Sequence, residues 1–232
     1  MLLMPIMQNK DSYVIFDFCQ TLCDFETADA FVEYVCEREI SKRIKLLCGF
    51  ECLLQRTKLV TLFDVFGHFA HYSLWKRLLL WNLKYISRES LEKYAEAFYK
   101  ERVKPHLINE TLIKLHNAKH NNFKVAVVSA SYDIILKYFV KEYGVDLLVT
   151  NQLKYRNEIF TGNISESDCI YKNKVHRFYN AVHPNNVDVI ESYGDSKSDI
   201  PILSIAKQGF VISRESHKQW VEHTNFKEII WL

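Results

Sequence analysis

Five short apolar segments, separated by stretches with a helical pattern, constrain the fold more strongly than any other feature of the sequence. They occupy residues 12–18, 124–131, 146–150, 187–194 and 209–213. Short runs of this kind, rich in β-branched residues, are typical of strands that are buried on both faces of a sheet. Helices are predicted over residues 132–143, which end at Gly144, and over residues 198–207, with Pro201 near the start. Strands that alternate with helices predict an α/β fold, with a parallel sheet covered by helices on both faces.

Residues 19–123 separate the first two of these strands, which is far more than a single connecting helix needs. The pattern in this stretch is helical nearly throughout. Ala28, Phe31 and Val35 share one helix face, and Ser87 is suited to cap a later helix. We therefore predict an α-helical cap domain at 25–105, inserted into a core formed by residues 1–24 and 106–232. We expect it to stand over the carboxyl ends of the strands, where open α/β sheets bind their ligands.

A smaller insertion, residues 152–164, lies between the third and fourth strands. Apolar residues flank an Arg156–Asn157 pair at its centre. This pattern predicts a β-hairpin.

Composition and charge argue against several classes of protein. The net charge of +2 is too small to indicate nucleic acid as the main partner. No apolar run approaches the roughly 20 residues that span a bilayer. Residues 1–7 are too short for a signal peptide and lack its basic start, so we expect a cytoplasmic protein with reduced thiols. No second ligand pair with zinc-type spacing accompanies Cys48 and Cys52, so we do not expect a metal site there. His68 and His71 share a helix face, and we interpret them as structural too.

Polar residues gather at the predicted strand ends and helix starts, where the sheet geometry would place a site. They are Asp17, Ser129, Lys174, Asp195 and Asp199. Each alone has a structural interpretation: a helix cap for the first aspartate and the serine, a surface residue for the lysine, and a turn formed by Asp195 with Ser196. Together, in this order, they favour a function.

The segments that carry these residues resemble the motifs of the haloacid dehalogenase superfamily. FDFCQTL, VVSAS, the lysine at position 174 and YGDSKSD are similar to its four motifs in sequence order. The helical insertion and the segments FYKERVKP and IFTGNI are similar to the branch that contains phosphoserine phosphatase. The resemblance covers nearly the whole chain and implies a Rossmann-like core with an inserted helical cap.

The resemblance also implies roles for single residues. Asp17 would be the nucleophile, and Mg²⁺ would be held by Asp17, the backbone carbonyl of Cys19 and Asp195, with Asp199 completing or orienting the set. The phosphate group would be bound by Ser129, Ala130 and Lys174, and Thr21 would steady the loop at the phosphate site. These roles are chemically coherent, because a carboxylate can attack phosphorus to form an aspartyl-phosphate while magnesium and fixed donors offset the negative charge.

Cys19 departs from the family pattern, which places a second aspartate there as the general acid and base. A thiol is a poor base unless it ionises. General acid–base assistance is worth roughly a hundred- to ten-thousand-fold in rate. We therefore predict weak hydrolysis of ordinary alkyl phosphates and a smaller loss for substrates with good leaving groups.

Three readings stay open for the function. The first is a phosphatase of a small phosphorylated metabolite that takes its proton donor from the cap or from the substrate. The second is a phosphotransferase or an enzyme that cleaves carbon–phosphorus bonds, and the third is a binding or regulatory module with poor turnover. Dehalogenation is disfavoured because the Asp195/Asp199 pair indicates a metal. In the cap, Arg56 or Lys58 could bind a carboxylate or second phosphate of the substrate, and nothing in the sequence favours one oligomeric state.

Overall fold

A six-stranded sheet forms the centre of the molecule in the computed structural model, which describes residues 10–39, 74–182 and 187–231. Its strands are β1 (Asp11–Phe16), β2 (Lys124–Tyr132), β3 (Leu147–Asn151), β6 (Val187–Gly194), β7 (Gln208–Arg214) and β8 (Lys227–Trp231). They lie in the order β3-β2-β1-β6-β7-β8, and every neighbouring pair is parallel. The predicted parallel sheet is confirmed, with β8 as an additional edge strand that the sequence pattern did not indicate.

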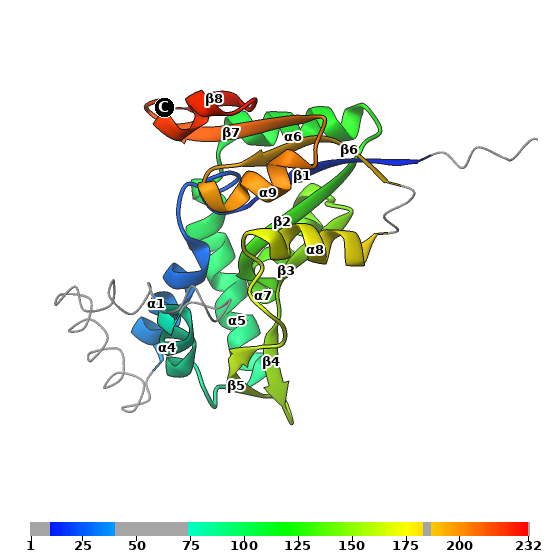
Figure 1. Cartoon of the computed structure of the whole chain (residues 1–232). Helices are drawn as coiled ribbons and strands as arrows, with labels where there is room; N and C mark the ends of the chain where they lie inside the picture. Colours follow the sequence, from blue (N-terminus) through cyan, green and yellow to red (C-terminus); the bar gives the residue numbers. More distant parts are fainter. Residues whose placement is uncertain (1–9, 40–73, 183–186, 232) are drawn as a thin grey trace, which may run out of the picture.

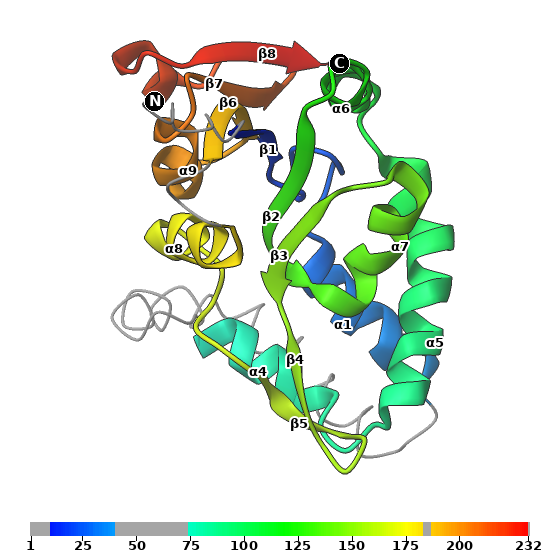
Figure 2. The ribbon, with the colours of Figure 1, turned by 90° about the vertical axis from the view of Figure 1, so that its right-hand side faces the viewer.

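Helices cover both faces of this sheet, as predicted (Figure 2). On one face lie α6 (Asn109–His120) and α7 (Asp133–Tyr143), and on the other lie α8 (Lys172–Ala181) and α9 (Ile200–Ser204). Alternate residues of β1 face opposite sides: Val14 and Phe16 belong to one buried cluster, Tyr13 and Ile15 to the other. Strands buried on both faces explain why the central segments read as continuous apolar runs.

Two predicted helices differ from the observed ones at their ends. The helix α7 begins one residue later than predicted, because Tyr132 still belongs to β2, and it ends at Gly144 in the left-handed conformation with φ of 61°. The helix predicted over residues 198–207 is wrong in length. A 3₁₀ turn, Lys197–Asp199, precedes the five-residue α9, and the chain then turns into β7.

An aromatic stack joins the three strands at the centre of the sheet. The rings of Phe16 and Tyr193 are 4.6 Å apart and tilted by 5°, and those of Tyr193 and Phe210 are 4.8 Å apart and tilted by 9°. Stacked rings at this spacing contribute beyond the area that they bury. They fix the relative positions of β1, β6 and β7 close to the strand ends that carry Asp17 and Asp195.

Helices also fill the described parts of the long stretch between β1 and β2 (Figure 1). They are α1 (Thr27–Arg38), α4 (Leu74–Asn82) and α5 (Arg88–Phe98), followed by a π-helical turn, Tyr99–Val103, and a 3₁₀ turn, Lys104–His106. The predicted cap of α5 is confirmed, since the Ser87 side chain accepts a hydrogen bond from the Ser90 backbone over 3.2 Å. The predicted inner face of α1 is confirmed too, because Ala28, Phe31 and Val35 are buried. A division between a core and a cap at 25–105 stays a prediction.

The predicted hairpin is formed by β4 (Leu153–Arg156) and β5 (Ile159–Ile164). Its turn is centred on Asn157 and Glu158, whose φ angles are 51° and 60°, and not on Arg156 and Asn157. Arg156 instead pairs with Ile159. Positive φ at both central residues matches the twist of the strands, and asparagine tolerates that conformation. The hairpin also pairs with the chain before α5, where the backbone N–H of Tyr85 donates to the Phe160 carbonyl over 3.0 Å.

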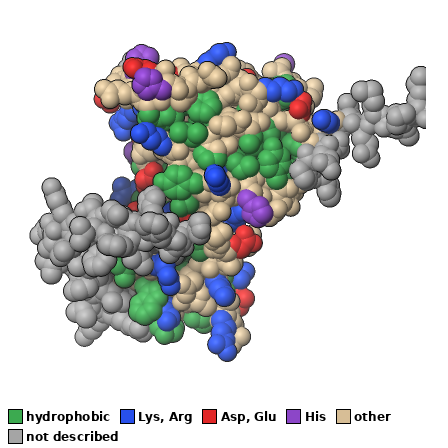
Figure 3. Space-filling model, in the orientation of Figure 1, with side chains coloured by type: hydrophobic (Ala, Val, Ile, Leu, Met, Phe, Trp, Pro, Cys, Tyr) green, Lys and Arg blue, Asp and Glu red, His purple; other side chains and the backbone are tan. Residues whose placement is uncertain are grey.

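Three cysteines, Cys19, Cys23 and Cys169, are buried free thiols. Cys36 is disulfide-bonded, so the expectation of reduced thiols is wrong at that position. Cys48, Cys52, His68, His71, Arg56 and Lys58 lie outside the described residues. Among the helices that are described, none is long and apolar enough to cross a membrane. On the face in Figure 3, basic side chains are spread over the surface with acidic ones among them.

Candidate active site

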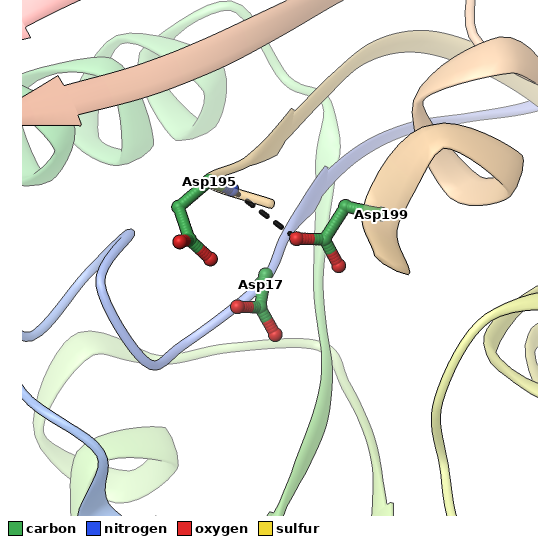
Figure 4. Close-up of side chains that lie close together, drawn as sticks. All are labelled: Asp17, Asp195 and Asp199. Carbon is green, nitrogen blue, oxygen red and sulfur yellow. Dashed lines mark hydrogen bonds between the residues drawn. The ribbon is translucent and has the colours of Figure 1, made fainter. Parts of the chain in front are cut away.

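Three aspartates meet at the carboxyl edge of the sheet (Figure 4). Asp17 directly follows β1, and its backbone donates to the Tyr193 carbonyl of β6 over 2.8 Å. Asp195 directly follows β6, and Asp199 ends the 3₁₀ turn after it. One carboxylate oxygen from each lies within 4.8 Å of the others. Neighbouring parallel strands therefore bring together side chains that are far apart in the sequence.

Gly194 allows the close approach of Asp199. A Cβ atom on this glycine would lie 2.7 Å from the Asp199 Cβ and 2.9 Å from its Cγ. Real Cβ contacts do not come this close, so a larger residue here would displace the aspartate. The glycine of YGDSKSD is required by packing against the last aspartate of the same motif.

The three carboxylates fit a divalent metal that prefers oxygen ligands, such as magnesium. Burial raises the pKa of Asp17 to about 8, with Asp199 and Asp195 raising it and Lys174 opposing them. Burial also raises the pKa of Asp195 to about 7, and repulsion from Asp199 adds to this effect. A cluster with excess negative charge of this kind holds its ionised form best when a cation is bound. Asp17 and Asp195 would be the principal side-chain ligands.

Asp199 differs from the other two, because donors occupy both of its oxygens. Its Oδ2 accepts from the backbone of Asp195 over 3.2 Å, and from the backbone and hydroxyl of Ser196 over 3.1 Å and 3.0 Å. Burial raises its pKa, but Lys174 and Ser196 lower it by more, so the net shift is downward. Asp199 is thus held as an anion that fixes the loop carrying Asp195.

Lys174, in the first turn of α8, is the cation of the cluster. Its ammonium lies 2.6 Å from Asp17 Oδ1 and 2.6 Å from Asp199 Oδ1, and the residue is only 3% exposed. Burial lowers its pKa, but the two carboxylates outweigh burial and raise the pKa above the ordinary value. Lys174 therefore stays charged and can stabilise negative charge that gathers beside Asp17.

The three aspartates and Lys174 line a pocket of about 150 Å³. Ser129 and Ala130, near the end of β2, also line it. The Ser129 hydroxyl accepts from the Ser131 backbone over 3.3 Å, and the Ala130 carbonyl accepts from the Asn151 side chain over 2.8 Å. These bonds fix the second of the four motif segments in the wall of the pocket that Asp17 also lines.

Cys19 also lines the pocket, but its sulfur is engaged by the start of α1. The backbone N–H of Thr27 donates to the sulfur over 3.4 Å, and the Thr27 hydroxyl lies 3.2 Å from it. That hydroxyl is 2.6 Å from the Ser131 hydroxyl. Burial raises the pKa of the Cys19 thiol well above its ordinary value, and Glu26 and Asp17 raise it further. The thiol is neutral and cannot serve as a base for water.

Thr21 lies apart from this set. It is fully buried, it does not line the pocket, and its hydroxyl has no hydrogen-bond partner within the described part of the chain. The amides of Thr21, Leu22 and Cys23 all donate to the Phe18 carbonyl, which closes the loop after Asp17. Arg56 is not among the described residues, so its place relative to the pocket stays a prediction.

Two charged residues of the pocket were missed by sequence reasoning. Glu26 lies just before α1 and is exposed to solvent. Lys76, in α4, reaches across to Asp168 over 3.2 Å, and the Asp168 side chain is 1% exposed. The position of Glu26 directly after the first motif could have indicated it. Lys76 carried no local signal, because its place depends on how α4 packs.

A larger cavity, of about 450 Å³, is lined by Asp24 and Phe25 of the segment that leads into α1. Phe25, Tyr34 and Phe98 form aromatic parts of its wall, and Arg102 and Arg214 are basic residues on it. None of the motif aspartates lines it. Size alone does not make it the active site, since the converging polar groups lie in the smaller pocket.

Comparison with known proteins agrees with this geometry. The model of the haloacid dehalogenase-like hydrolase family matches residues 14–204. Phosphoserine phosphatase of Methanocaldococcus jannaschii is 26% identical over 233 residues, which cover 97% of this chain and 98% of that protein. Protein CicA of Caulobacter vibrioides is 29% identical over 123 residues, or 52% of this chain, so the match spans about half of CicA (53%).

A solved structure of similar fold is a protein of unknown function from Bordetella pertussis Tohama I. It superimposes with a TM-score of 0.76 at 16% identity, over 95% of this chain and 98% of that one. At this identity the likeness concerns the fold alone. The family match, in contrast, covers most of the chain and includes all four motif regions. The chain therefore belongs to the haloacid dehalogenase-like hydrolase family.

Proposed function

We propose that this protein is a magnesium-dependent phosphatase that hydrolyses a small phosphomonoester through an aspartyl-phosphate at Asp17. The observation that carries the proposal is the contact of Asp17 with Lys174, over 2.6 Å, inside a cluster that also contains Asp195 and Asp199. A nucleophilic carboxylate, a fixed cation and a pair of candidate metal ligands are the groups that this reaction needs. The full-length similarity to a phosphoserine phosphatase supports the same reaction class.

In the first step, an oxygen of Asp17 attacks phosphorus and the bond between phosphorus and the ester oxygen breaks. Lys174 and Ser129, both lining the pocket, bind oxygens of the transferring group. In the second step, water attacks the phosphorus of the aspartyl-phosphate, which releases phosphate and restores the Asp17 carboxylate. Bound magnesium would neutralise charge on the phosphoryl oxygens and on the carboxylates of Asp17 and Asp195.

Proton transfer to the leaving group and from water is the part of this reaction that the chain is least equipped to assist. The leaving alkoxide must take up a proton, and water must lose one, but Cys19 is neutral and engaged by Thr27. The leaving groups of aryl and acyl phosphates can depart without being protonated, so these compounds should be the better substrates. Alkyl phosphates should be slower by roughly a hundred- to ten-thousand-fold than with a positioned acid.

A second candidate function is a phosphate-binding module with slow turnover. The state of Cys19 supports it, because the residues proposed to bind phosphate line one pocket while Cys19 supplies no proton donor there. A phosphotransferase would use the same first step with an acceptor other than water. Phosphate binding without release of inorganic phosphate would distinguish the module from the phosphatase.

The test is release of inorganic phosphate from an aryl phosphate and from a panel of alkyl phosphates, with and without magnesium. Wild type should hydrolyse the aryl ester only when magnesium is present. Asp17→Asn should be inactive, because the amide keeps the shape of the nucleophile but not its charge. Asp188→Asn, on an exposed surface pair with Lys207, is the matched control and should keep full activity. Activity that persists in Asp17→Asn or in excess chelator would contradict the proposal.

A further inference from the structure

Lys218 contacts the loop of Asp195 from outside the four motifs. It lies between β7 and the 3₁₀ turn Gln219–His223. Its ammonium donates to the backbone carbonyl of Asp195, and to that of Ile212 over 2.9 Å. The same nitrogen is 3.6 Å from Asp195 Oδ2. One side chain thus bridges the end of β6 and the middle of β7 next to a candidate metal ligand.

The backbone of Lys218 is itself fixed by the edge of the sheet. Glu228 of β8 accepts from the Lys218 backbone N–H over 2.9 Å, and it also accepts from the Ser213 hydroxyl. The Glu228 side chain is only 10% exposed. Donors from Ser213 and Lys218 help to hold it ionised, and its pKa is lowered overall although burial opposes this. The backbone of Lys218 is therefore held by Glu228 of β8, and its ammonium group is held by two backbone carbonyls.

The geometry distinguishes positioning from simple charge pairing. At 3.6 Å the ammonium is too far from the Asp195 carboxylate for a hydrogen bond, whereas it donates directly to the carbonyl of the same residue. The Asp195 carboxylate also lies within 4.8 Å of those of Asp17 and Asp199, and like charges at this distance repel one another. A fixed backbone keeps that carboxylate near Asp17.

We propose that Lys218 is a positioning residue that holds the Asp195 backbone so that its carboxylate can bind magnesium. The inference rests on the proposed function, because it assigns a role toward the metal of that site. Lys218 touches neither the phosphate pocket nor the other two aspartates in any contact of the described residues. It acts on the metal through Asp195.

Groups that orient metal ligands typically contribute 10- to 100-fold to metal affinity. Lys218→Met keeps the length and apolar stem of the side chain but removes its donors. We expect it to weaken magnesium binding by about 10- to 100-fold. Lys218→Arg keeps donors and charge and should recover most of the affinity. If the lysine instead competed with the metal for Asp195, Lys218→Met would bind magnesium more tightly.

The experiment is calorimetric titration of the full chain with magnesium chloride, with the shift in melting temperature on adding magnesium as a second readout. Lys207→Met is the matched control, since Lys207 forms an ion pair with exposed Asp188 over 2.5 Å. It should bind magnesium as wild type does. At saturating magnesium, Lys218→Met should recover much of the turnover of wild type, because only its metal affinity is changed.

Two results would overturn the inference in distinguishable ways. Equal or tighter magnesium binding by Lys218→Met, with normal binding by wild type, would remove the role of Lys218 and leave the proposed function intact. A wild-type protein that binds no magnesium would overturn both. If Lys218→Met proves unfolded by circular dichroism, Lys218→Leu, which also removes the donors, replaces it, and affinity equal to that of wild type would again overturn the inference.

Discussion

At the scale of single residues, Cys19 differs from the aspartate that the family pattern places at this position. Its sulfur accepts from the Thr27 backbone at the start of α1, a position where an aspartate carboxylate could accept the same hydrogen bond. The cysteine therefore preserves the contact that joins the first motif to α1. It does not preserve a group that exchanges a proton near neutral pH. Cys19 thus keeps the structural role that an aspartate would have at this position but not its role in proton transfer.

We expect Cys19→Asp to increase the hydrolysis of alkyl phosphates by up to about a hundred- to ten-thousand-fold. The gain should be much smaller for an aryl phosphate, whose leaving group needs no proton. The measurement is kcat/KM for one alkyl and one aryl ester under saturating magnesium. Cys19→Asn, which has the shape of aspartate without its acid, is the control and should gain nothing. An equal gain for both esters would indicate a change in binding and would contradict this account.

The sequence indicated which polar residues would lie together at one edge of the sheet, while their roles stay predictions. Asp17, Ser129, Lys174, Asp195 and Asp199 all line one pocket. The rule that parallel strands bring their carboxyl ends together connects Asp17, Ser129 and Asp195, whereas Lys174, which lies in α8, was connected to them by the family resemblance. Thr21 was expected at the phosphate site, but its side chain is buried away from the pocket. Which way a loop residue points depends on the local backbone, here the residues around Gln20, whose φ is 55°.

At the scale of elements, the sequence indicated the buried strands of the sheet and missed the partly buried edge strand β8. The segment of β8 is only partly buried along its length, so it lacks the continuous apolar run of the central strands. Its pairing with β7 depends on tertiary contacts such as Glu228 with Ser213. The hairpin was recognised from its turn residues, although its centre lay one residue further along the chain.

The helix α4 is tied to the core by the ion pair of Lys76 with Asp168, whose carboxylate also accepts from Asn151 over 2.5 Å. Lys76→Met leaves that buried carboxylate with one partner fewer, and we expect it to cost about 1–3 kcal/mol in the free energy of unfolding. Urea denaturation measures this loss. The double variant Lys76→Met/Asp168→Asn removes both charges and should recover part of the loss, which gives a favourable coupling in the double-mutant cycle.

The matched control for this pair is Lys93→Met, since Lys93 and Glu89 form an exposed pair on α5. Exposed pairs contribute little, so its unfolding free energy should change by less than about 0.5 kcal/mol. Additive effects of the two substitutions at Lys76 and Asp168 would show that the ion pair does not couple α4 to the core.

At the scale of the whole molecule, one buried cluster runs from the sheet into the helical insertion. It includes Val14 and Phe16 of β1, Leu136 of α7, and Phe31 and Phe98 of α1 and α5. The sequence indicated an insertion from the spacing of its strands, but the extent of this shared core could not be inferred, because it depends on which faces meet. We therefore expect the described part of the insertion to unfold together with the sheet.

Stability of the whole chain should depend on pH through the aspartate cluster. An acid whose pKa is higher in the folded state binds its proton more tightly there, so its contribution is present at low pH and is lost as pH rises. For Asp195 and Asp17 the pKa rises from 3.8 to about 7 and about 8. Without metal, the melting temperature should therefore fall between about pH 4 and about pH 8. The pKa of Asp199 is lowered in the folded state, so its stabilising contribution is constant across this window and is lost only at lower pH.

Magnesium should reverse this dependence, because it binds the ionised carboxylates and so stabilises the folded chain more as pH rises. Melting curves in chelator and in excess magnesium, measured across the same pH range, should separate progressively toward alkaline pH. Asp17→Asn removes one raised pKa and should flatten the curve in chelator. Asp188→Asn, at an exposed carboxylate whose pKa is lowered by Lys207, should leave that curve unchanged. Burial and mutual repulsion of these carboxylates raise their pKa values, and raised pKa values require the stability of the metal-free protein to fall as pH rises. A metal-free protein whose stability instead increased up to about pH 8 would contradict the raised pKa values of Asp17 and Asp195.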